Sequence, residues 1–260
     1  MTKTVVFIHG AFTNPACWQD WIALFEGRGV RCLAPAWPHN DGDVATLRAK
    51  PDPQLAGVGV AEIVDHYAAA IEALPERPWL IGHSFGGLFV QLLLARGLGK
   101  GGVAIHPAPP RGIPPAPDAI KSNFPVLKVW GGHKKLHTMS FQDFCGGFDN
   151  GRPEAEQRAA YDRWIVPTPG RPFFQAGFAP FHSITEVDWM ARKVPLAIFC
   201  GGADKQVPAS MNEANHRKYA KNPATTELIR FEDRNHLTIG VPGWESVATR
   251  ALDWLETQAP

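Results

Sequence analysis

The sequence predicts an α/β protein in which a mostly parallel sheet is covered by helices on both faces. Six short runs of apolar residues show no polar alternation, as is typical of strands buried on both faces, and segments with helical periodicity separate them. Strands that alternate with helices pair in parallel through right-handed crossovers. The 260 residues, of which 45% are hydrophobic, are enough for one large domain with a sizeable core.

The expected strands are spread along the whole chain. They cover residues 4–8, 30–34, 78–82, 102–106, 194–200 and 225–231. The clearest helix is expected over 59–74, because its apolar residues recur along one helical face. A second helix is expected over 88–95, shortly after the third strand.

One interval, residues 107–182, breaks the alternation. It opens at the stretch HPAPPRGIPPAP, whose prolines exclude a helix interior and favour an extended connector. Further on, Ser140 and Asp143 have the spacing of a helix-capping box, and Pro153 is placed to begin a helix that runs to Ile165. We therefore expect a mostly helical cap over 107–182, inserted between two parts of one core, 1–106 and 183–260.

Composition narrows the range of partners. The formal net charge is +1, without basic or acidic runs, so neither nucleic acid nor an anionic membrane surface is indicated. No apolar run reaches the roughly 20 residues of a membrane span, and we expect a cytoplasmic protein whose partner is a small molecule. The sequence leaves the oligomeric state open, a homodimer included. The four cysteines have no metal or redox spacing and are expected to be buried free thiols.

The stretch WLIGHSFGGL places a serine at the end of the third predicted strand. Ser84 lies between Gly82 and Gly86, in the pattern G-x-S-x-G, just before the helix expected over 88–95. A sharp strand-to-helix turn exposes the residue at its tip above the sheet, and the flanking glycines relieve the crowding. The amides at the start of the helix face negative charge that develops beside the serine. Ser84 is therefore a candidate nucleophile.

A serine nucleophile needs a base and a group that orients the base. Asp204 follows the fifth predicted strand in GGADKQVP, and His236 follows the sixth in EDRNHLTI. Both would emerge at the carboxyl edge of a parallel sheet, where Ser84 also lies. The position after the fourth strand, HPAP, holds no carboxylate, and Asp118 is the alternative acid beyond the prolines.

The stretch HGAF after the first strand supplies a fourth element. The backbone N–H groups of Ala11 and Phe85 are expected to form an oxyanion hole. Together, FIHGAF, IGHSFGG, GGAD and RNH resemble the α/β-hydrolase superfamily, in the order of its motifs and over nearly the whole chain outside the cap. The resemblance implies the α/β-hydrolase fold with an inserted helical cap, and a catalytic triad of Ser84, Asp204 and His236 that works without a cofactor.

The cap contains many phenylalanines, including the stretch FFQAGFAPF, which is too apolar to be buried completely in so short a segment. We expect part of the cap to line an apolar pocket above the nucleophile. The residues expected to bind substrate are Phe12, Phe144, Phe178 and Val207. The leading function is therefore a carboxylesterase-type serine hydrolase acting on a small hydrophobic ester, a lactone or an amide.

Other functions remain open at this stage. Plant hydroxynitrile lyases are similar in size and cap placement, but they typically have threonine where Gly10 stands and lysine where Leu237 stands, which favours the hydrolase. A perhydrolase-type activity and a ligand receptor that retains the triad are further alternatives. His133 and His137 have a spacing that could hold a metal on a helix, but the glutamate expected beside the first histidine is absent, so no metal is expected.

Overall fold

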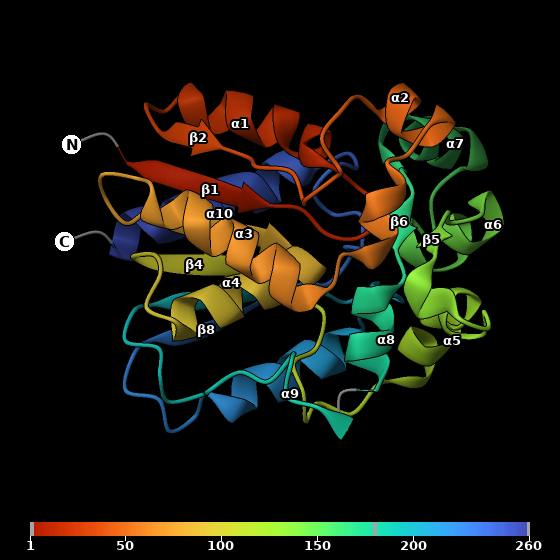
Figure 1. The fold of residues 1–260 in the computed structure, drawn as a ribbon. Coiled ribbons are helices and arrows are strands. Elements are labelled where there is room, and N and C mark those ends of the chain that lie inside the picture. The colour runs from red at the N-terminus through yellow and green to blue at the C-terminus, as the bar shows by residue number, and fades with distance from the viewer. Residues whose placement is uncertain (1–2, 179–180, 259–260) are drawn as a thin grey trace.

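A six-stranded parallel sheet forms the centre of the molecule, with the strand order β2-β1-β3-β4-β7-β8 (Figure 1). The computed structural model describes residues 3–178 and 181–258. The strands are β1 (Thr4–Ile8), β2 (Arg31–Leu33), β3 (Trp79–His83), β4 (Gly101–Ile105), β7 (Leu196–Gly201) and β8 (Thr226–Phe231). All six predicted strands are present, with ends that differ from the prediction by at most two residues. The prediction of a mostly parallel α/β fold is confirmed.

Helices cover both faces of this sheet. One face carries α1 (Gln19–Glu26) and α10 (Trp244–Gln258), which contact each other, and the other carries α3 (Val60–Glu72), α4 (Phe85–Ala95) and α9 (Ala209–Lys218) (Figure 1). The helix predicted over 59–74 is α3, and the helix predicted over 88–95 begins three residues earlier, as α4. Within residues 3–178 and 181–258, none of the helices combines the length and the apolar character that a membrane crossing requires.

The central strands explain why the sequence shows no polar alternation. Every residue of β3, β4 and β7 is buried, because helices cover both faces of the sheet at these strands. On the α1 face, Trp21 packs edge-on against Phe7 and Trp18, and its indole N–H donates to the carbonyl of Ile239 at 2.9 Å. These large rings are completely buried, so the cluster is a major part of the core, and the indole N–H that finds a partner is that of Trp21.

The cysteines are free thiols, but only two of the four are buried. Cys17 and Cys200 lie in the core, whereas Cys32 and Cys145 are half-buried. The expectation that all four are buried is therefore wrong. Cys32 lies in β2, which is the edge strand of the sheet and has a neighbouring strand on one side only.

The interval between β4 and β7 leaves the sheet and lies beyond the carboxyl ends of its strands (Figure 1). It contains α5 (Pro117–Leu127), α6 (Phe141–Asp143), α7 (Glu154–Trp164) and α8 (Arg171–Gly177), with a π-helical turn at Phe144–Phe148. A two-stranded antiparallel sheet that the sequence analysis did not anticipate, β5 (Leu136–His137) with β6 (Thr168–Pro169), joins these helices. The remaining helix, α2 (Val44–Ala49), lies near α7 in the same region (Figure 1).

The turn between β3 and α4 is possible only with glycines at two positions. A Cβ at Gly82 would lie 2.2 Å from the carbonyl oxygen of Gly86, and a Cβ at Gly86 would lie 2.0 Å from the carbonyl oxygen of Ile8. Both contacts are with backbone, which cannot move aside as a flexible side chain can. The two glycines therefore allow α4 to pack directly against the ends of β1 and β3.

Replacing Gly86 should disrupt this packing. We expect Gly86→Ala to lower the free energy of unfolding by at least about 3 kcal/mol, the upper range for overpacked sites, because its Cβ would overlap the β1 backbone. Urea denaturation followed by tryptophan fluorescence measures the change. The matched control is Gly146→Ala, where no atom lies within 4 Å of the added Cβ, and equal stability of the two variants would contradict the prediction.

Candidate active site

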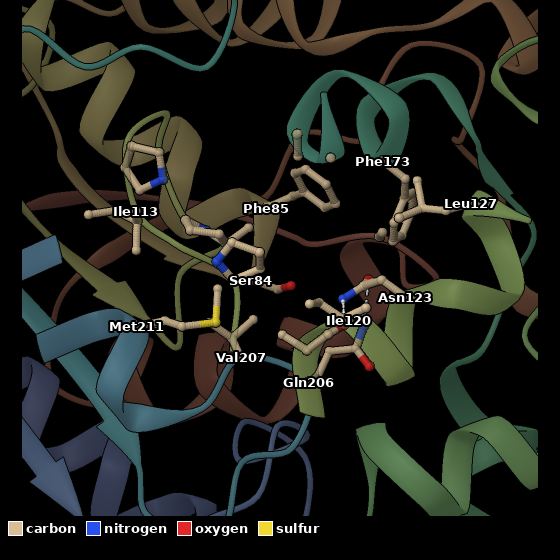
Figure 2. Close-up of a pocket in the computed structure, with 18 of the residues that line it drawn as sticks. Ser84, Phe85, Ile113, Ile120, Asn123, Leu127, Phe173, Gln206, Val207 and Met211 are labelled. Carbon is tan, nitrogen blue, oxygen red and sulfur yellow. Dashed lines mark hydrogen bonds between the residues drawn. The ribbon is translucent and has the colours of Figure 1, made fainter. Parts of the chain in front are cut away.

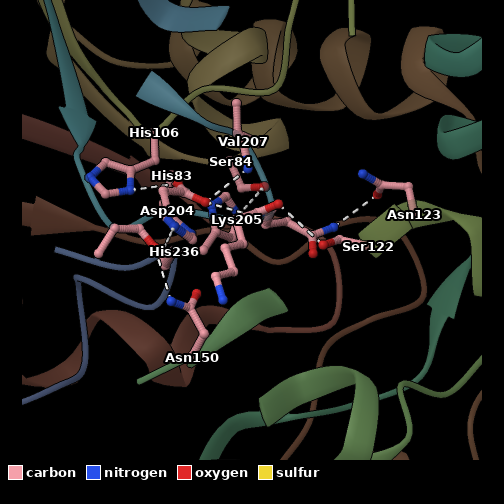
Figure 3. A network of polar contacts seen from close by, with 12 residues as sticks. His83, Ser84, His106, Ser122, Asn123, Asn150, Asp204, Lys205, Val207 and His236 are labelled. Carbon is pink, nitrogen blue, oxygen red and sulfur yellow. Dashed lines mark hydrogen bonds and ion pairs between the residues drawn. The ribbon is translucent and has the colours of Figure 1, made fainter. Parts of the chain in front are cut away.

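Three loops at the carboxyl edge of the sheet bring Ser84, His236 and Asp204 into one line of hydrogen bonds (Figure 3). Ser84 follows β3, Asp204 follows β7 and His236 follows β8. The distance from Ser84 Oγ to His236 Nε2 is 3.0 Å, and that from His236 Nδ1 to Asp204 Oδ2 is 2.8 Å. The structure therefore brings the three predicted triad residues together, in the arrangement of a nucleophile, a base and an orienting acid.

The backbone of Ser84 is strained. Its φ is 56° and its ψ is −121°, a region that residues other than glycine rarely adopt. The strain is held by two neighbours, since the Ser84 N–H donates to Ile105 O at 3.0 Å and Ser84 O accepts from the Ala108 N–H at 2.9 Å. This turn points the hydroxyl into a cavity above the sheet (Figure 2).

The Asp204 carboxylate is completely buried and receives four hydrogen bonds. The backbone N–H groups of Gln206 and Val207 donate to Oδ1, each at 2.8 Å. His236 and His106 donate through Nδ1 to Oδ2, at 2.8 and 2.9 Å. Burial alone would raise the pKa of Asp204, but the charge and hydrogen bonds of the two histidines hold this pKa well below its usual range. The acid is therefore ionised at neutral pH.

The second histidine on this carboxylate, His106, was missed by the sequence analysis. The stretch HPAP, which holds the position after the fourth strand, contains no carboxylate but does contain this histidine. The signal that could have found His106 was the presence of a histidine directly after a strand. Because β4 and β7 are neighbours in the sheet, the residues that follow these two strands meet at its edge. Asp118, the alternative acid, is exposed in the first turn of α5.

His236 is held from two sides. The Nε2–H of His83 donates to the carbonyl of His236 at 2.7 Å, with the two ring centroids 4.7 Å apart. The Phe148 ring meets the His236 ring edge-on, with centroids 4.9 Å apart. His83 thus helps to hold His236 in place, and Phe148 is a further site residue that the sequence analysis missed.

The two predicted oxyanion donors lie beside Ser84 in the cavity wall. Ala11 and Phe85 both line the cavity, and Phe85 is the first residue of α4. No group among the described residues accepts a hydrogen bond from either backbone N–H. Both donors are thus available to a ligand.

His9 shapes the loop that carries Ala11. Its Nδ1–H donates to Gly10 O at 2.9 Å, and its Nε2 accepts from the Trp37 N–H at 3.2 Å. The Trp37 ring stacks on the imidazole, with centroids 5.0 Å apart. Burial lowers the pKa of His9 to about 4, so the ring is neutral at neutral pH.

The cavity above Ser84 has a volume of about 590 Å³ and a mostly apolar wall (Figure 2). Both the core and the interval between β4 and β7 contribute to it. Its main lining residues are Ala11, Phe12, Ser84, Phe85, Ile113, Ile120, Asn123, Leu127, Phe148, Phe173, Gln206, Val207 and Met211. The amide of Gln206 donates to Asn123 Oδ1 at 2.9 Å, so these two polar groups partly satisfy each other. The charged side chain in the wall, Arg111, is paired with Glu186 at 2.6 Å.

Two of the four predicted substrate-binding residues line this cavity, and two do not. Phe12 and Val207 are in its wall. Phe144 is completely buried behind it, stacked on Phe148 with centroids 5.8 Å apart, and Phe148 takes the place expected for it. Phe178 is 51% exposed and stacks on Phe174, outside the cavity wall. In the stretch FFQAGFAPF, residues 179–180 lie outside the described residues.

The histidines considered for metal binding do not lie on one helix. His133 is in a 3₁₀ turn and His137 is in β5, where its Nε2–H donates to Gly132 O at 2.9 Å. Within the described residues, a metal-sized group of donors is formed by His106, Asp204 and His236. In this group the Nδ1 of each histidine lies at hydrogen-bonding distance from Asp204 Oδ2. Each Nδ1 therefore carries a proton and has no lone pair with which to bind a metal.

Comparison with known proteins identifies the family. A model described as the alpha/beta hydrolase family matches residues 5–245. The match covers more than half of the chain, and the sheet order and the Ser84 turn are those of this fold. The chain therefore belongs to the α/β-hydrolase family. A search of curated proteins finds no significant match.

Solved structures with the same fold include several named enzymes. A monoacylglycerol lipase of Paleococcus ferrophilus is 20% identical with a TM-score of 0.72, covering 99% of this chain and 96% of that chain. A methylesterase from Arabidopsis is 16% identical with a TM-score of 0.71, covering 98% and 100%. A pyrethroid hydrolase from Sphingobium faniae is 18% identical with a TM-score of 0.68, covering 98% of each chain. At these identities, the similarity establishes the fold.

The buried neutral His9 should make the protein less stable in acid. Below about pH 6.5 the unfolded chain binds a proton at this residue that the folded chain, with a pKa of about 4, does not bind. The free energy of unfolding should therefore fall as the pH drops from 6.5 to 4, with about 3 kcal/mol of the loss due to His9.

The test compares urea denaturation at pH values from 7.5 to 5. We expect His9→Gln to reduce the slope of stability against pH, because one proton fewer is taken up on unfolding. The control His66→Gln changes an exposed histidine of α3 and should leave the slope as in the wild type. A slope unchanged by His9→Gln would show that His9 is protonated in the folded protein.

Proposed function

We propose that this protein is a serine hydrolase that cleaves a carboxylic ester of a small, hydrophobic, uncharged substrate through an acyl-enzyme. The observation that carries the proposal is the line of hydrogen bonds from Ser84 through His236 to Asp204, at the base of an apolar cavity. A serine hydroxyl is a weak nucleophile at neutral pH, and this arrangement supplies the base that activates it. The activity is of the carboxylesterase type, EC 3.1.1.

Each residue of the site has a role in this mechanism. Asp204 accepts the Nδ1–H of His236, so the lone pair of Nε2 faces Ser84 Oγ. As Oγ attacks the carbonyl carbon, Nε2 takes the hydroxyl proton and then passes it to the leaving alcohol. The N–H groups of Ala11 and Phe85 donate to the oxyanion. Water then attacks the acyl carbon while His236 Nε2 takes its proton. The bond to Ser84 Oγ breaks, the acid leaves, and Nε2 returns the proton to Oγ.

The cavity supports an uncharged, apolar substrate. Its wall is mostly aliphatic and aromatic. The polar side chains in the wall away from Ser84 are the amides of Asn123 and Gln206 and the guanidinium of Arg111, which is paired with Glu186. Residues 107–182 act as the cap in this proposal, because α5, the π-helical turn and α8 contribute Ile120, Phe148 and Phe173 to the wall. Two of the similar structures, a monoacylglycerol lipase and a methylesterase, bear names that denote ester cleavage. Lactones and amides share the same carbonyl chemistry.

The alternatives are less well supported by the site. A Cβ at Gly10 would lie 2.9 Å from the Ser84 Cβ, so the threonine of plant hydroxynitrile lyases would crowd the nucleophile here. Leu237, in the place of their lysine, is buried. Peroxide in place of water would make perhydrolysis a side reaction of the same acyl-enzyme. A receptor that retains the triad would differ in showing no rapid ester turnover.

Ser84→Ala should abolish ester hydrolysis and labelling by a fluorophosphonate probe, because the variant lacks the hydroxyl that attacks the carbonyl. Hydrolysis of 4-nitrophenyl butyrate and mass spectrometry of the labelled peptide measure the two effects. The control Ser183→Ala changes an exposed serine and should keep both. Labelling at another serine, or turnover that survives in Ser84→Ala, would contradict the proposal.

The apolar wall should discriminate strongly against charged acyl groups. We expect kcat/KM for 4-nitrophenyl hemisuccinate to be at least about 100-fold lower than for the butyrate, because its carboxylate would be buried against a mostly apolar wall whose arginine, Arg111, is already paired with Glu186. Ile120→Lys adds a cation to the wall at a residue that is 52% exposed. Because this cation can pair with the carboxylate of the hemisuccinate, the variant should reduce the difference in kcat/KM between the two esters. Similar rates for the two esters in the wild type would show that the acyl group does not enter the cavity.

A further inference from the structure

Two imidazoles converge on a single oxygen of the Asp204 carboxylate (Figure 3). His236 Nδ1 lies 2.8 Å from Oδ2, and His106 Nδ1 lies 2.9 Å from the same atom. All three side chains are completely buried. The mechanism proposed above uses His236 and Asp204 but assigns nothing to His106.

The His106 ring is held in place by a strained backbone and a close contact. Its φ is 45°, in the left-handed region, where a residue other than glycine stores of the order of 1–3 kcal/mol of strain. Space for the ring depends on Gly201, where a Cβ would lie 2.5 Å from His106 Cε1. The backbone N–H of His106 donates to Phe199 O at 2.9 Å, which ties the strained residue to β7. The strained backbone of His106 and the absence of a side chain at Gly201 together allow the ring to lie beside Asp204.

The surroundings of His106 determine its charge and tautomer. The titratable or charged groups that face the His106 ring are Asp204, His236, His83 and Arg234. Burial lowers the pKa of His106 despite the nearby carboxylate, so the ring is neutral at neutral pH. Because Nδ1 faces a carboxylate oxygen, its single proton is on Nδ1. Its Nε2 has no hydrogen-bond partner among the described residues.

We propose that His106 is a positioning residue of the triad. It donates its Nδ1–H to Oδ2 of Asp204 and so weakens the stabilisation that this carboxylate gives to the protonated ring of His236. The inference rests on the proposed function. An oxygen that accepts two hydrogen bonds shares its electron density between them, so it stabilises the imidazolium form of His236 less than an oxygen with one donor would. The Nε2 lone pair of His236 is therefore left available to accept the hydroxyl proton of Ser84.

The first test needs no variant and no activity. The imidazole ¹⁵N shifts of the wild-type protein, measured by NMR at pH 7.5, report which ring nitrogen of each histidine carries the proton. We expect the Nδ1–H tautomer for both His106 and His236. A proton on Nε2 of His106 would overturn the proposal, because Nδ1 would then have no hydrogen to donate.

The second test removes or keeps the donor. His106→Phe fills the same space without an N–H, whereas His106→Asn keeps an amide N–H near the position of Nδ1 and tolerates a positive φ. We expect the acid limb of kcat/KM against pH to move up by about one pH unit in His106→Phe and to stay near the wild-type position in His106→Asn. Equal acid limbs in all three proteins, or equal displacement in both variants, would overturn the proposal.

The NMR titration separates this inference from the proposed function. The pH at which the His236 ring takes up its proton, followed by its ¹³Cε1–H signal, should rise in His106→Phe whether or not the protein hydrolyses esters. If the wild type shows no ester turnover but this midpoint still rises, the function is wrong and the role of His106 stands. If esters are hydrolysed and the midpoint does not move, the role of His106 is wrong. Should His106→Phe not fold, a proton on Nε2 of His106 in the wild type would still overturn the proposal.

Discussion

The close approach of α4 to the ends of β1 and β3 is the constraint on which the site depends. Without a Cβ at Gly82 or Gly86, the first turn of α4 packs against the carbonyl of Ile8 and reverses the chain within one residue. That reversal forces Ser84 into its strained conformation and leaves its hydroxyl at the tip of the turn. It also places the N–H of Phe85 at the start of the helix, beside the hydroxyl. The positions of the proposed nucleophile and of one proposed oxyanion donor thus both follow from one packing contact.

The loop that carries Asp204 connects the proposed triad to the segment between β4 and β7. A buried charge is tolerated when it is fully hydrogen-bonded, and the four donors around Asp204 meet that condition. The same loop is tied to α5, since Ser122 Oγ donates to Lys205 O at 3.1 Å (Figure 3). The loop of His236 is tied in the same way, because Asn235 donates to the buried carboxylate of Asp149 at 2.8 Å. The segment between β4 and β7, which lines the cavity, therefore also supports the loops that carry Asp204 and His236.

Much of the fold followed from local patterns. Continuous apolar runs located all six strands to within two residues, because burial on both faces removes polar residues from a strand regardless of its neighbours. The meeting of Ser84, Asp204 and His236 at one edge could also be predicted, because residues that follow parallel strands share the carboxyl edge of the sheet. The glycine pattern around Ser84 indicated the turn, since only glycine fits such contacts.

The sequence by itself determined the order of strands and helices, the turn at Ser84 and which loops carry Asp204 and His236, because these depend on periodicity, glycine spacing and position along the chain. The tertiary structure alone decided which aromatic side chain reaches the cavity. Phe144 and Phe148 lie on the same π-helical turn, and their packing against Tyr161 and His236 sends the first into the core and the second to the site. It also decided the partner of His106, because a hydrogen bond between residues 98 positions apart depends on which strands are neighbours in the sheet, and local sequence does not encode that order.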